Sequence, residues 1–486
     1  MADKMQRFVD INARMPDKRT ADARRTDFGE IYDPYTPARA TEQSSRCEQC
    51  GIPYCQIHCP LQNNIPDWLR LAAEDRLEEA YALAQATNTF PEICGRICPQ
   101  DRLCEGSCVL EQSRHGSVTI GAVEKHITDT AWEQGWVKGP APTQERAESI
   151  GIIGAGPGGL AAADALRTAG YQVHVYDRYD RAGGLLIYGI PNFKLEKEVV
   201  ERRTRLLADS GVVFHQNFEV GKKGKQHATL AELREKHDAV LIATGVYKAR
   251  DLNAPGSGLG GILAAMDYLT ASNRAGLGDR VAGLKDGSLN AEGKNVVVIG
   301  GGDTAMDCVR TAVRQGAKSV KCLYRRDRAN MPGSMREVSN AEEEGVEFVW
   351  LAAPEAFLGD DTVSGVRTHM MRLGAPDASG RQTPEIIDGS SYTIDADMVI
   401  TALGFDPEDL PTLFGEPTLP VTDWGTISVN PVSKMSALPG VFAAGDIVRG
   451  ASLVVWAIRD GRDAAGAIHQ FIQRKDTAPA PSGDLP

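Results

Sequence analysis

The stretch from Ser149 to Arg178 constrains the fold of this chain most strongly, because it has the pattern of a strand, a glycine turn, a helix and a second strand. Gly154, Gly156 and Gly159 have G-x-G-x-x-G spacing. In such a turn the first glycine permits the tight bend, the second lets a pyrophosphate approach the backbone, and the third lets helix and strand pack closely. The second strand ends at Asp177, where a carboxylate would bind a ribose hydroxyl. The stretch therefore predicts a βαβ dinucleotide-binding unit.

A second unit of the same kind lies between Lys294 and Arg326 and carries the accepted variant G-x-G-x-x-A. Its second strand ends in two arginines instead of an acid. An acid would bind the free 2′-hydroxyl of NAD, whereas arginine can bind the 2′-phosphate of NADP through charge-assisted hydrogen bonds. Ordinary surface arginines are the alternative, but their position at the strand end favours NADPH. The residues predicted to bind NADPH are Gly300, Gly302, Asp303, Thr304, Ala305, Arg325 and Arg326.

One chain with an acid-ended and an arginine-ended unit has the arrangement of a flavin–nicotinamide oxidoreductase, with FAD at the first unit and NADPH at the second. Hydride transfer between the two ring systems needs stacking geometry more than an acid or a base. We therefore predict no catalytic side chain.

The C-terminal stretch from Leu438 to Ile468 returns to the first unit as a strand, a glycine–aspartate turn and a helix. Asp446 is predicted to accept a hydrogen bond from the ribityl chain of the flavin. The helix N-terminus near Ser452 would stabilise negative charge at the N1–C2 edge of the reduced ring, and a capped surface helix is the alternative. The residues predicted to bind FAD are Gly154, Gly156, Gly159, Asp177, Gly184, Thr244, Gly245, Gly445, Asp446, Ser452 and Leu453.

Eight of the ten cysteines lie between Cys47 and Cys108, in two groups with the spacings C-x2-C-x4-C-x3-C-P and C-x3-C-P-x4-C-x3-C. Zinc sites usually combine pairs of C-x2-C, and only one such pair is present. In ferredoxin-like runs, a Cys-Pro follows three closely spaced cysteines, and its cysteine ligates the other cluster. This pattern favours two iron–sulfur clusters over zinc.

The crossing-over rule assigns ligands to both clusters. The ligands predicted for the first cluster are Cys47, Cys50, Cys55 and Cys108. The ligands predicted for the second cluster are Cys59, Cys98, Cys104 and one further residue. For this fourth position Cys94 is the simple candidate and Glu124 the less obvious one, since Glu124 would otherwise be a solvated helix carboxylate.

Composition excludes several classes of protein. With 53 basic and 65 acidic residues the formal net charge is -12, which argues against nucleic acid as a partner. No apolar run is long enough to span a bilayer, so no membrane partner is expected. The charged N-terminal stretch is unlike a secretory signal. We therefore expect a cytoplasmic protein, in which structural disulfides are disfavoured.

These patterns predict an α/β fold with two Rossmann-like domains in a glutathione-reductase-like arrangement, preceded by a mainly helical iron–sulfur domain. The polar, Pro-rich stretch 138–147 is predicted as a linker. Within the helical domain, 65–86 is predicted as one helix with Asn64 as its N-cap. The predicted segments are 1–147 (two clusters), 148–255 (first FAD-binding segment), 256–394 (NADPH), 395–475 (second FAD-binding segment) and 476–486 (a mobile tail).

The motifs IGAGPGGLAAA, IATG, GGGDTAMD, YRRD, ITALGF and GVFAAGD, behind C-x2-C-x4-C-x3-CP, resemble those of the small (beta) subunits of NADPH-dependent glutamate synthases. The resemblance covers nearly the whole chain. It implies a subunit that oxidises NADPH at FAD and passes electrons through two [4Fe–4S] clusters to a large (alpha) subunit. The FMN of that partner would reduce the 2-iminoglutarate formed from 2-oxoglutarate and glutamine-derived ammonia, and the complex would make two glutamates.

The N-terminal and flavin modules also resemble dihydropyrimidine dehydrogenase, in which one cluster has a glutamine ligand downstream of the last cysteine. The matching position here is Glu124, so the resemblance favours Glu124 over Cys94 as the fourth ligand, and both stay open. Two other functions also remain open. One is a flavin-dependent NADPH:ferredoxin-type oxidoreductase with a different partner, and the other is a zinc-stabilised scaffold without chemistry.

Overall fold

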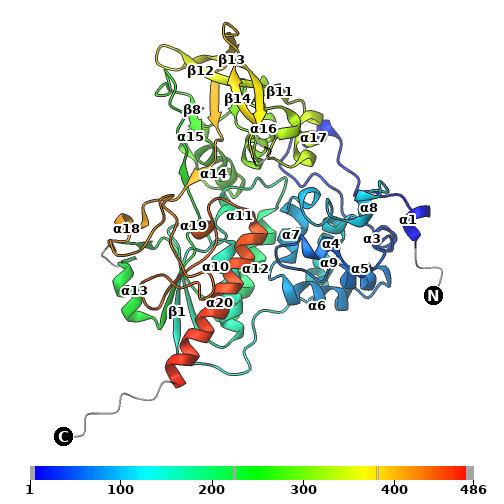
Figure 1. Ribbon diagram of the computed structural model, residues 1–486, viewed down its shortest axis with the longest axis vertical. Helices are drawn as coiled ribbons and strands as arrows, with labels where there is room; N and C mark the ends of the chain where they lie inside the picture. Colours follow the sequence, from blue (N-terminus) through cyan, green and yellow to red (C-terminus); the bar gives the residue numbers. More distant parts are fainter. Residues whose placement is uncertain (1–5, 223–225, 379, 381, 478–486) are drawn as a thin grey trace.

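The computed structural model describes residues 6–222, 226–378, 380 and 382–477. Figure 1 shows three regions. The helical region comprises residues 37–133, the first sheet domain contains the five-stranded sheet that includes β1, and the second sheet domain contains the sheet that includes β9. Strand order and helix packing within these regions decide where the candidate sites lie.

The first sheet has five parallel strands in the order β18-β6-β1-β2-β3. Its strands are β1 (Ser149–Ile153), β2 (Gln172–Tyr176), β3 (Val213–His215), β6 (Ala239–Ile242) and β18 (Val441–Ala443).

Helices α10 (Pro157–Thr168) and α20 (Val454–Thr477) run side by side across one face of this sheet (Figure 1). Successive strand residues point to opposite faces, so Ile152 packs in the core beneath these helices, whereas Ile153 packs on the other side. The other elements of this domain are α11 (Leu185–Tyr188), α12 (Lys197–Asp209), β4 (Glu219–Val220), β5 (His227–Ala228), α13 (Leu230–Lys236), α18 (Leu410–Leu413) and α19 (Asp446–Arg449).

The second sheet repeats this plan with five parallel strands in the order β11-β10-β9-β16-β8. Its strands are β8 (Ile262–Ala264), β9 (Asn295–Ile299), β10 (Ser319–Tyr324), β11 (Glu347–Trp350) and β16 (Met398–Thr401). Its helices are α14 (Ala265–Gly276), α15 (Ala282–Lys285), α16 (Asp303–Arg314) and α17 (Met335–Glu343). An antiparallel extension contains β12 (Ala352–Gly359), β13 (Val363–Pro376), β14 (Gln382–Ile386) and β15 (Tyr392–Asp395).

The position of β16 corrects the predicted segment 395–475. The sequence analysis places Met398–Thr401 in the second FAD-binding segment, but this strand pairs with β9 and β8 of the second sheet. The reason is that the two segments are equivalent in the two sheets. DAVLIATG contains β6, which pairs with β1, and ADMVITALG contains β16, which pairs with β9. The chain returns at β17 (Phe405–Asp406), which pairs with β7 (Lys248–Ala249) of the outgoing connection.

The helical region corrects a second expectation, because 65–86 forms two helices instead of one. Helix α5 (Ile65–Ala73) and helix α6 (Leu77–Thr87) are separated by a turn in which Asp75 has a φ of 59°. Asn64 makes no side-chain capping bond. The turn lets both helices pack on α9 (Ile120–Glu133), which is the central helix of this region. Its other helices are α3 (Pro37–Ser44), α4 (Tyr54–Ile57), α7 (Pro91–Ile97) and α8 (Val109–Gln112).

Buried arginine–glutamate pairs join separate parts of the chain. Arg203 of α12 donates two hydrogen bonds to Glu92 of α7, at 2.7 and 3.0 Å, so the first sheet domain is tied to the helical region. The N-terminal segment, which includes α1 (Arg7–Asp10) and α2 (Ala21–Arg24), reaches the second sheet domain near α17 (Figure 1). There Arg24 pairs with Glu344 at 3.1 Å, and both side chains are buried.

Helix α20 extends to Thr477, two residues into the segment predicted as a tail, and 478–486 lie outside the described residues. In the described residues, no helix combines the length and apolar character needed to cross a membrane.

The contact between α10 and α20 generates a prediction. A Cβ added at Gly461 of α20 would lie 2.1 Å from the carbonyl oxygen of Gly158, whereas one added at Gly466 would meet nothing within 4 Å. We expect Gly461→Ala to lower the melting temperature by several degrees, because overpacking costs about 1–3 kcal/mol. Gly466→Ala is the matched control and should raise it slightly, since alanine favours a helix by about 1 kcal/mol over glycine. Equal melting temperatures for the two variants would contradict the close contact.

Candidate cofactor sites

The first glycine turn has the geometry that a dinucleotide requires. Gly154 has a φ of 108°, and a Cβ there would lie 2.4 Å from the carbonyl oxygen of Ala243. A Cβ at Gly159 would lie 1.9 Å from the carbonyl oxygen of Gly154, so only glycine lets α10 approach β1 this closely. A Cβ at Gly156 would meet nothing within 4 Å. The middle glycine therefore faces open space, where a phosphate can approach the backbone.

Asp177 lies beside this turn and also shapes it. Its carboxylate accepts hydrogen bonds from the backbone N–H of Ala155 at 2.6 Å and of Tyr179 at 2.8 Å. Burial raises the pKa of Asp177, and these two bonds oppose the shift. Because a carboxylate has about four lone-pair sites, two remain for a ligand hydroxyl.

A cavity of about 190 Å³ extends from this turn toward α20. The predicted FAD residues that line it are Gly154, Gly156, Asp177, Thr244, Gly245, Gly445, Asp446 and Leu453. Three others lie elsewhere: Gly159 is under the turn, Gly184 packs against Gly156, and Ser452 lines the larger cavity described below.

A side-chain oxygen of Asp446 that lacks a hydrogen-bond partner in the described part of the chain indicates that this cavity is suited to a polar ligand. Within the described residues its buried Oδ1 atom has no hydrogen-bond partner. Burial raises the pKa of Asp446 to about 6, and a backbone bond from Ser452 opposes the shift. A buried oxygen without a donor is unfavourable, so a ligand hydroxyl fits here.

Sequence reasoning missed the aromatic end of this cavity. The guanidinium of Arg178 lies 5.3 Å from the ring centre of Tyr179 and 5.1 Å from that of Tyr247, and it pairs with Glu408 at 2.9 Å. All four residues line the cavity. Their positions in the sequence could have indicated them. Arg178 and Tyr179 directly follow Asp177, and Tyr247 follows the turn at Gly245.

The second glycine turn repeats the first. A Cβ at Gly300 would lie 2.3 Å from the carbonyl oxygen of Ala402, and one at Gly302 would meet nothing within 4 Å. Ala305 is buried at the third position. Asp303 and Thr304 line the large cavity.

The two predicted phosphate-binding arginines lie at the end of β10. Arg325 is exposed, whereas Arg326 is half-buried and donates to the carbonyl oxygen of Gln382 at 3.2 Å. Neither belongs to the residues that line the two larger cavities.

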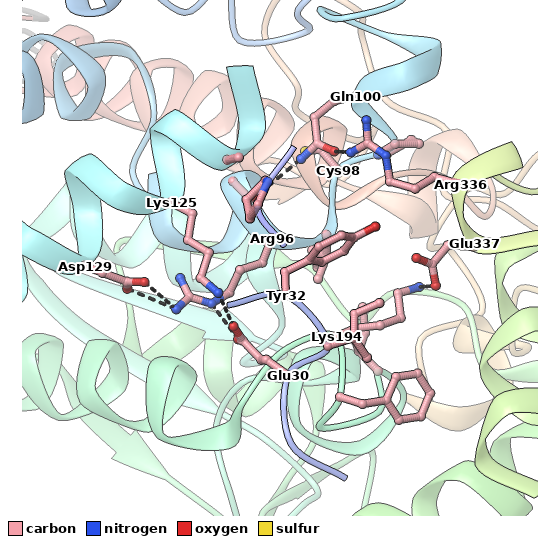
Figure 2. Close-up of a pocket in the computed structure, with 18 of the residues that line it drawn as sticks. Glu30, Tyr32, Arg96, Cys98, Gln100, Lys125, Asp129, Lys194, Arg336 and Glu337 are labelled. Carbon is pink, nitrogen blue, oxygen red and sulfur yellow. Dashed lines mark hydrogen bonds and ion pairs between the residues drawn. The ribbon is translucent and has the colours of Figure 1, made fainter. Parts of the chain in front are cut away.

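A cavity of about 810 Å³ lies where the three regions meet (Figure 2). The helical region contributes Cys98 and Gln100, the first sheet domain contributes Ser452 and Leu453, and the second sheet domain contributes Arg336. The N-terminal segment closes a section of its wall with other residues. The cavity therefore joins the second glycine turn to the residues that precede helix α20.

Charged side chains of this wall are paired with one another, as Figure 2 shows. Glu30 pairs with Arg96 at 2.7 Å and with Lys125, and Arg96 also pairs with Asp129 at 2.8 Å. Burial alone would raise the pKa of Glu30, but Arg96 and Lys125 hold it below its usual value. These contacts fix the N-terminal segment against α7 and α9.

The eight N-terminal cysteines surround two cavities of about 30 Å³ each, in the predicted grouping. Among the described residues no three His, Cys, Asp or Glu side chains gather as closely as a single metal ion needs. Burial raises the pKa of Cys47 to about 11 and that of Cys55 to about 12. Thiolate ligands at these positions would therefore depend on the positive charge of a bound metal. The first cavity is lined by Cys47, Cys50, Cys55 and Cys108. The second is lined by Cys59, Cys94, Cys98, Cys104 and Glu124.

Both candidates for the fourth ligand thus line the second cavity. Glu124 is only 6% exposed, and its Oε1 atom accepts hydrogen bonds from Asn63 at 3.0 Å and Asn88 at 3.3 Å. Burial raises the pKa of Glu124 to about 8, and the two amides oppose this shift. Cys94 is also buried, and its carbonyl oxygen accepts a bond from Gln100 at 3.1 Å.

The four cavities form a continuous row because neighbours share lining residues. The 190 Å³ and 810 Å³ cavities share Leu185 and Leu453. The 810 Å³ cavity and the second cysteine cavity share Cys98 and Gln100, and the two cysteine cavities share Ile120. The row thus leads from the first glycine turn, through the meeting point of the three regions, to the two cysteine sets.

Comparison with protein families identifies two segments. Residues 24–136 match the family described as dihydropyrimidine dehydrogenase domain II, 4Fe-4S cluster. Residues 148–461 match the pyridine nucleotide-disulphide oxidoreductase family. These matches confirm the predicted iron–sulfur character of the helical region and remove support from the zinc alternative.

Comparison with individual proteins finds similar chains. The glutamate synthase [NADPH] small chain of Azospirillum brasilense is 68% identical over 476 residues, which are 98% of each chain. The putative oxidoreductase AegA of Escherichia coli is 44% identical over 467 residues, which are 94% of this chain and 69% of that one. A solved structure of Mycobacterium tuberculosis FprA in complex with NADPH has a TM-score of 0.57 at 22% identity, and the match covers 68% of this chain and 86% of that chain. The last likeness supports the predicted two-domain α/β fold alone.

The unpaired Oδ1 atom of Asp446 predicts a pH dependence of the affinity for the predicted flavin. A ribityl hydroxyl would donate to the ionised form of Asp446, so binding would lower its pKa and release a proton. FAD affinity of the flavin-free protein should therefore be constant above pH 6 and fall below it, by at most about tenfold per pH unit. Titration by flavin fluorescence measures this. Asp446→Asn should flatten the profile, and an unchanged slope in that variant would contradict the role.

Proposed function

This chain belongs to the family of glutamate synthase [NADPH] small chains, and we propose that it is the electron-input subunit of such an enzyme. It is an NADPH-dependent oxidoreductase. In the proposed reaction it oxidises NADPH at FAD and passes the electrons through two [4Fe–4S] clusters to an FMN-containing large subunit. That partner makes L-glutamate from L-glutamine and 2-oxoglutarate. The observation that carries the proposal is the row of four cavities, since it orders the sites as such a transfer requires.

The cavities support the following cofactor assignments. FAD binds the first glycine turn, with its ribityl chain at Asp446, and NADPH binds the second turn. Arg325 and Arg326, which lie at the end of β10 and outside the two larger cavities, would contact the 2′-phosphate. The two glycine turns support the phosphate positions through their open middle glycines. The flavin would supply the change from two-electron to one-electron transfer, and this chain's residues bind and orient it.

We assign the first cluster to Cys47, Cys50, Cys55 and Cys108, and the second to Cys59, Cys98, Cys104 and Glu124. Glu124 is favoured over Cys94 by its surroundings. Asn63 and Asn88 orient its carboxylate toward a shared cavity, and their amides stabilise a charge that would otherwise be costly to bury. A cluster iron would supply the cationic partner of this carboxylate.

This assignment predicts different effects for two substitutions. Cys94→Ser should keep the full iron and sulfide content, because the thiol is not a ligand. Glu124→Ala should lose iron from the second cluster or change its electron paramagnetic resonance spectrum. Iron and acid-labile sulfide assays with this spectroscopy measure both effects. Loss of the second cluster in Cys94→Ser, with a normal cluster in Glu124→Ala, would reverse the assignment.

The first cysteine cavity lies at the end of the row and close to the surface. Four apolar side chains around its ligands are exposed, and we call them the exit patch: Ile52 (61%), Tyr54 (44%), Ile57 (55%) and Val109 (40%). Tyr54 and Val109 line the cavity as well. Exposed apolar groups that gather at one place mark a protein interface. Because electron transfer weakens steeply with distance, we propose that the large subunit covers this patch.

The test combines the purified chain with a large subunit of the family and follows NADPH-driven glutamate formation. We expect glutamate, with FAD and about eight iron atoms from this chain. Ile57→Asp should reduce glutamate formation at least tenfold while NADPH-dependent reduction of a dye continues. Val432→Asp is the matched control, because Val432 is 86% exposed and lines neither cysteine cavity. Equal effects of the two substitutions would contradict the exit patch.

A flavin-dependent NADPH:ferredoxin-type oxidoreductase with another partner is the alternative function. The similarity to AegA favours keeping it, since that relative is named only as a putative oxidoreductase. Dye reduction with intact clusters but no glutamate in the presence of the large subunit would favour this alternative.

A further inference from the structure

Gln100 lies in the wall between the large cavity and the second cysteine cavity. It lines both, as does Cys98 two residues before it. Its side-chain amide donates to the backbone carbonyl oxygens of Cys94 at 3.1 Å and Gly95 at 3.3 Å. A Cβ at Gly121 would lie 2.4 Å from its Nε2 atom, so the wall has no spare room. The loop Gln100–Glu105 is therefore closely packed beside the cysteines.

A short segment of the second sheet domain is bonded to this loop. Arg336 donates to the Oε1 atom of Gln100 at 3.2 Å and pairs with Glu105 at 2.6 Å (Figure 2 shows the contact with Gln100). The hydroxyl of Ser334 donates to both carboxylate oxygens of Asp101 at 3.1 Å. Arg102 donates to the backbone oxygen of Pro332. Four side-chain contacts thus connect 332–336 with the loop that carries Cys104.

The same segment also contacts the second glycine turn. The N–H of Gly333 donates to the carbonyl oxygen of Gly301 at 3.0 Å, and the N–H of Ser334 donates to the carboxylate of Asp303 at 2.9 Å. A Cβ at Gly333 would lie 3.1 Å from that carbonyl oxygen. The segment 332–336 is therefore a direct link between the proposed nucleotide turn and the second cysteine cavity.

Glu105 is the charged group at the cluster end of this link. It directly follows Cys104 in the chain, it is only 3% exposed, and its Oε1 atom accepts a bond from the N–H of Gly121 at 3.0 Å. Its other oxygen is the one that Arg336 contacts. A buried carboxylate next to a cluster ligand would oppose the arrival of an electron, because reduction adds negative charge. The positive charge of the Arg336 guanidinium offsets that opposition.

We propose that Arg336 is a positioning residue for electron transfer, whose pairing with Glu105 raises the reduction potential of the cluster held by Cys59, Cys98 and Cys104. A residue of the nucleotide-binding domain thereby sets the potential of a cluster in another region of the chain. Net charge and hydrogen bonding near a cluster are recognised determinants of its potential. This inference rests on the proposed function, because it requires the second cluster.

The test is a redox titration of the purified chain followed by electron paramagnetic resonance. Arg336→Gln should lower the equilibrium constant for one-electron reduction of the second cluster about tenfold, a fall of about 59 mV in its midpoint potential. Arg336→Lys keeps the charge and should leave the potential near that of the unaltered chain. Arg372→Gln is the matched control, because it breaks an exposed ion pair with Glu385 far from the cysteines in the sequence.

The double variant Glu105→Gln/Arg336→Gln separates charge from packing. Removing one partner leaves a buried charge unpaired, whereas removing both does not, so the double variant should restore the potential and should fold even where Arg336→Gln does not. An unchanged potential in Arg336→Gln, or equal shifts in the Lys and Gln variants, would overturn the inference. Absence of iron and sulfide from the unaltered chain would instead overturn the proposed function, and the inference with it.

Discussion

Arginine–glutamate pairs between separate parts of the chain, each with at least one buried partner, are the interaction on which the row of cavities depends. Arg203 with Glu92 joins the first sheet domain to the helical region, and Arg24 with Glu344 joins the N-terminal segment to the second sheet domain. Arg336 with Glu105 joins the second sheet domain to the helical region. Such pairs add little net stability, because desolvation offsets their attraction, but breaking one leaves a costly unpaired charge. Their effect is positional: they penalise any arrangement in which the regions separate. Cavities that lie in different regions consequently keep constant separations.

The two sheet domains have the same backbone geometry at their glycine turns. In each, the first glycine of the turn lies against the carbonyl oxygen of an alanine. This alanine is Ala243, directly after β6, in the first sheet and Ala402, directly after β16, in the second. In each, the middle glycine faces open space. The difference lies in the side chains that follow the second strand, with Asp177 in one sheet and Arg325 in the other. In the proposed function, the backbone would bind phosphate in both domains, and single side chains would distinguish the ligands.

Sequence reasoning was most successful where the chemistry is local. The glycine spacing and the two cysteine runs are properties of short segments. The structure places Cys47, Cys50 and Cys55 of the first run around one cavity with Cys108 of the second run, as the crossing-over rule predicts. It was less successful where a pattern is ambiguous in context. The run at Met398–Thr401 has the pattern of a buried strand in either sheet, and the break at Asp75 left no clear signal in an otherwise helical pattern.

The sequence by itself determined the two dinucleotide turns, the cysteine sets and the family, because each depends on residue types at fixed spacings along the chain. Only the tertiary structure decided how these sites meet. The shared wall at Cys98 and Gln100, the exposure of the patch around Tyr54, and the contact of Arg336 with Glu105 join residues from separate elements. No local pattern encodes such contacts, since they arise when buried surfaces and charges of distant segments are satisfied together.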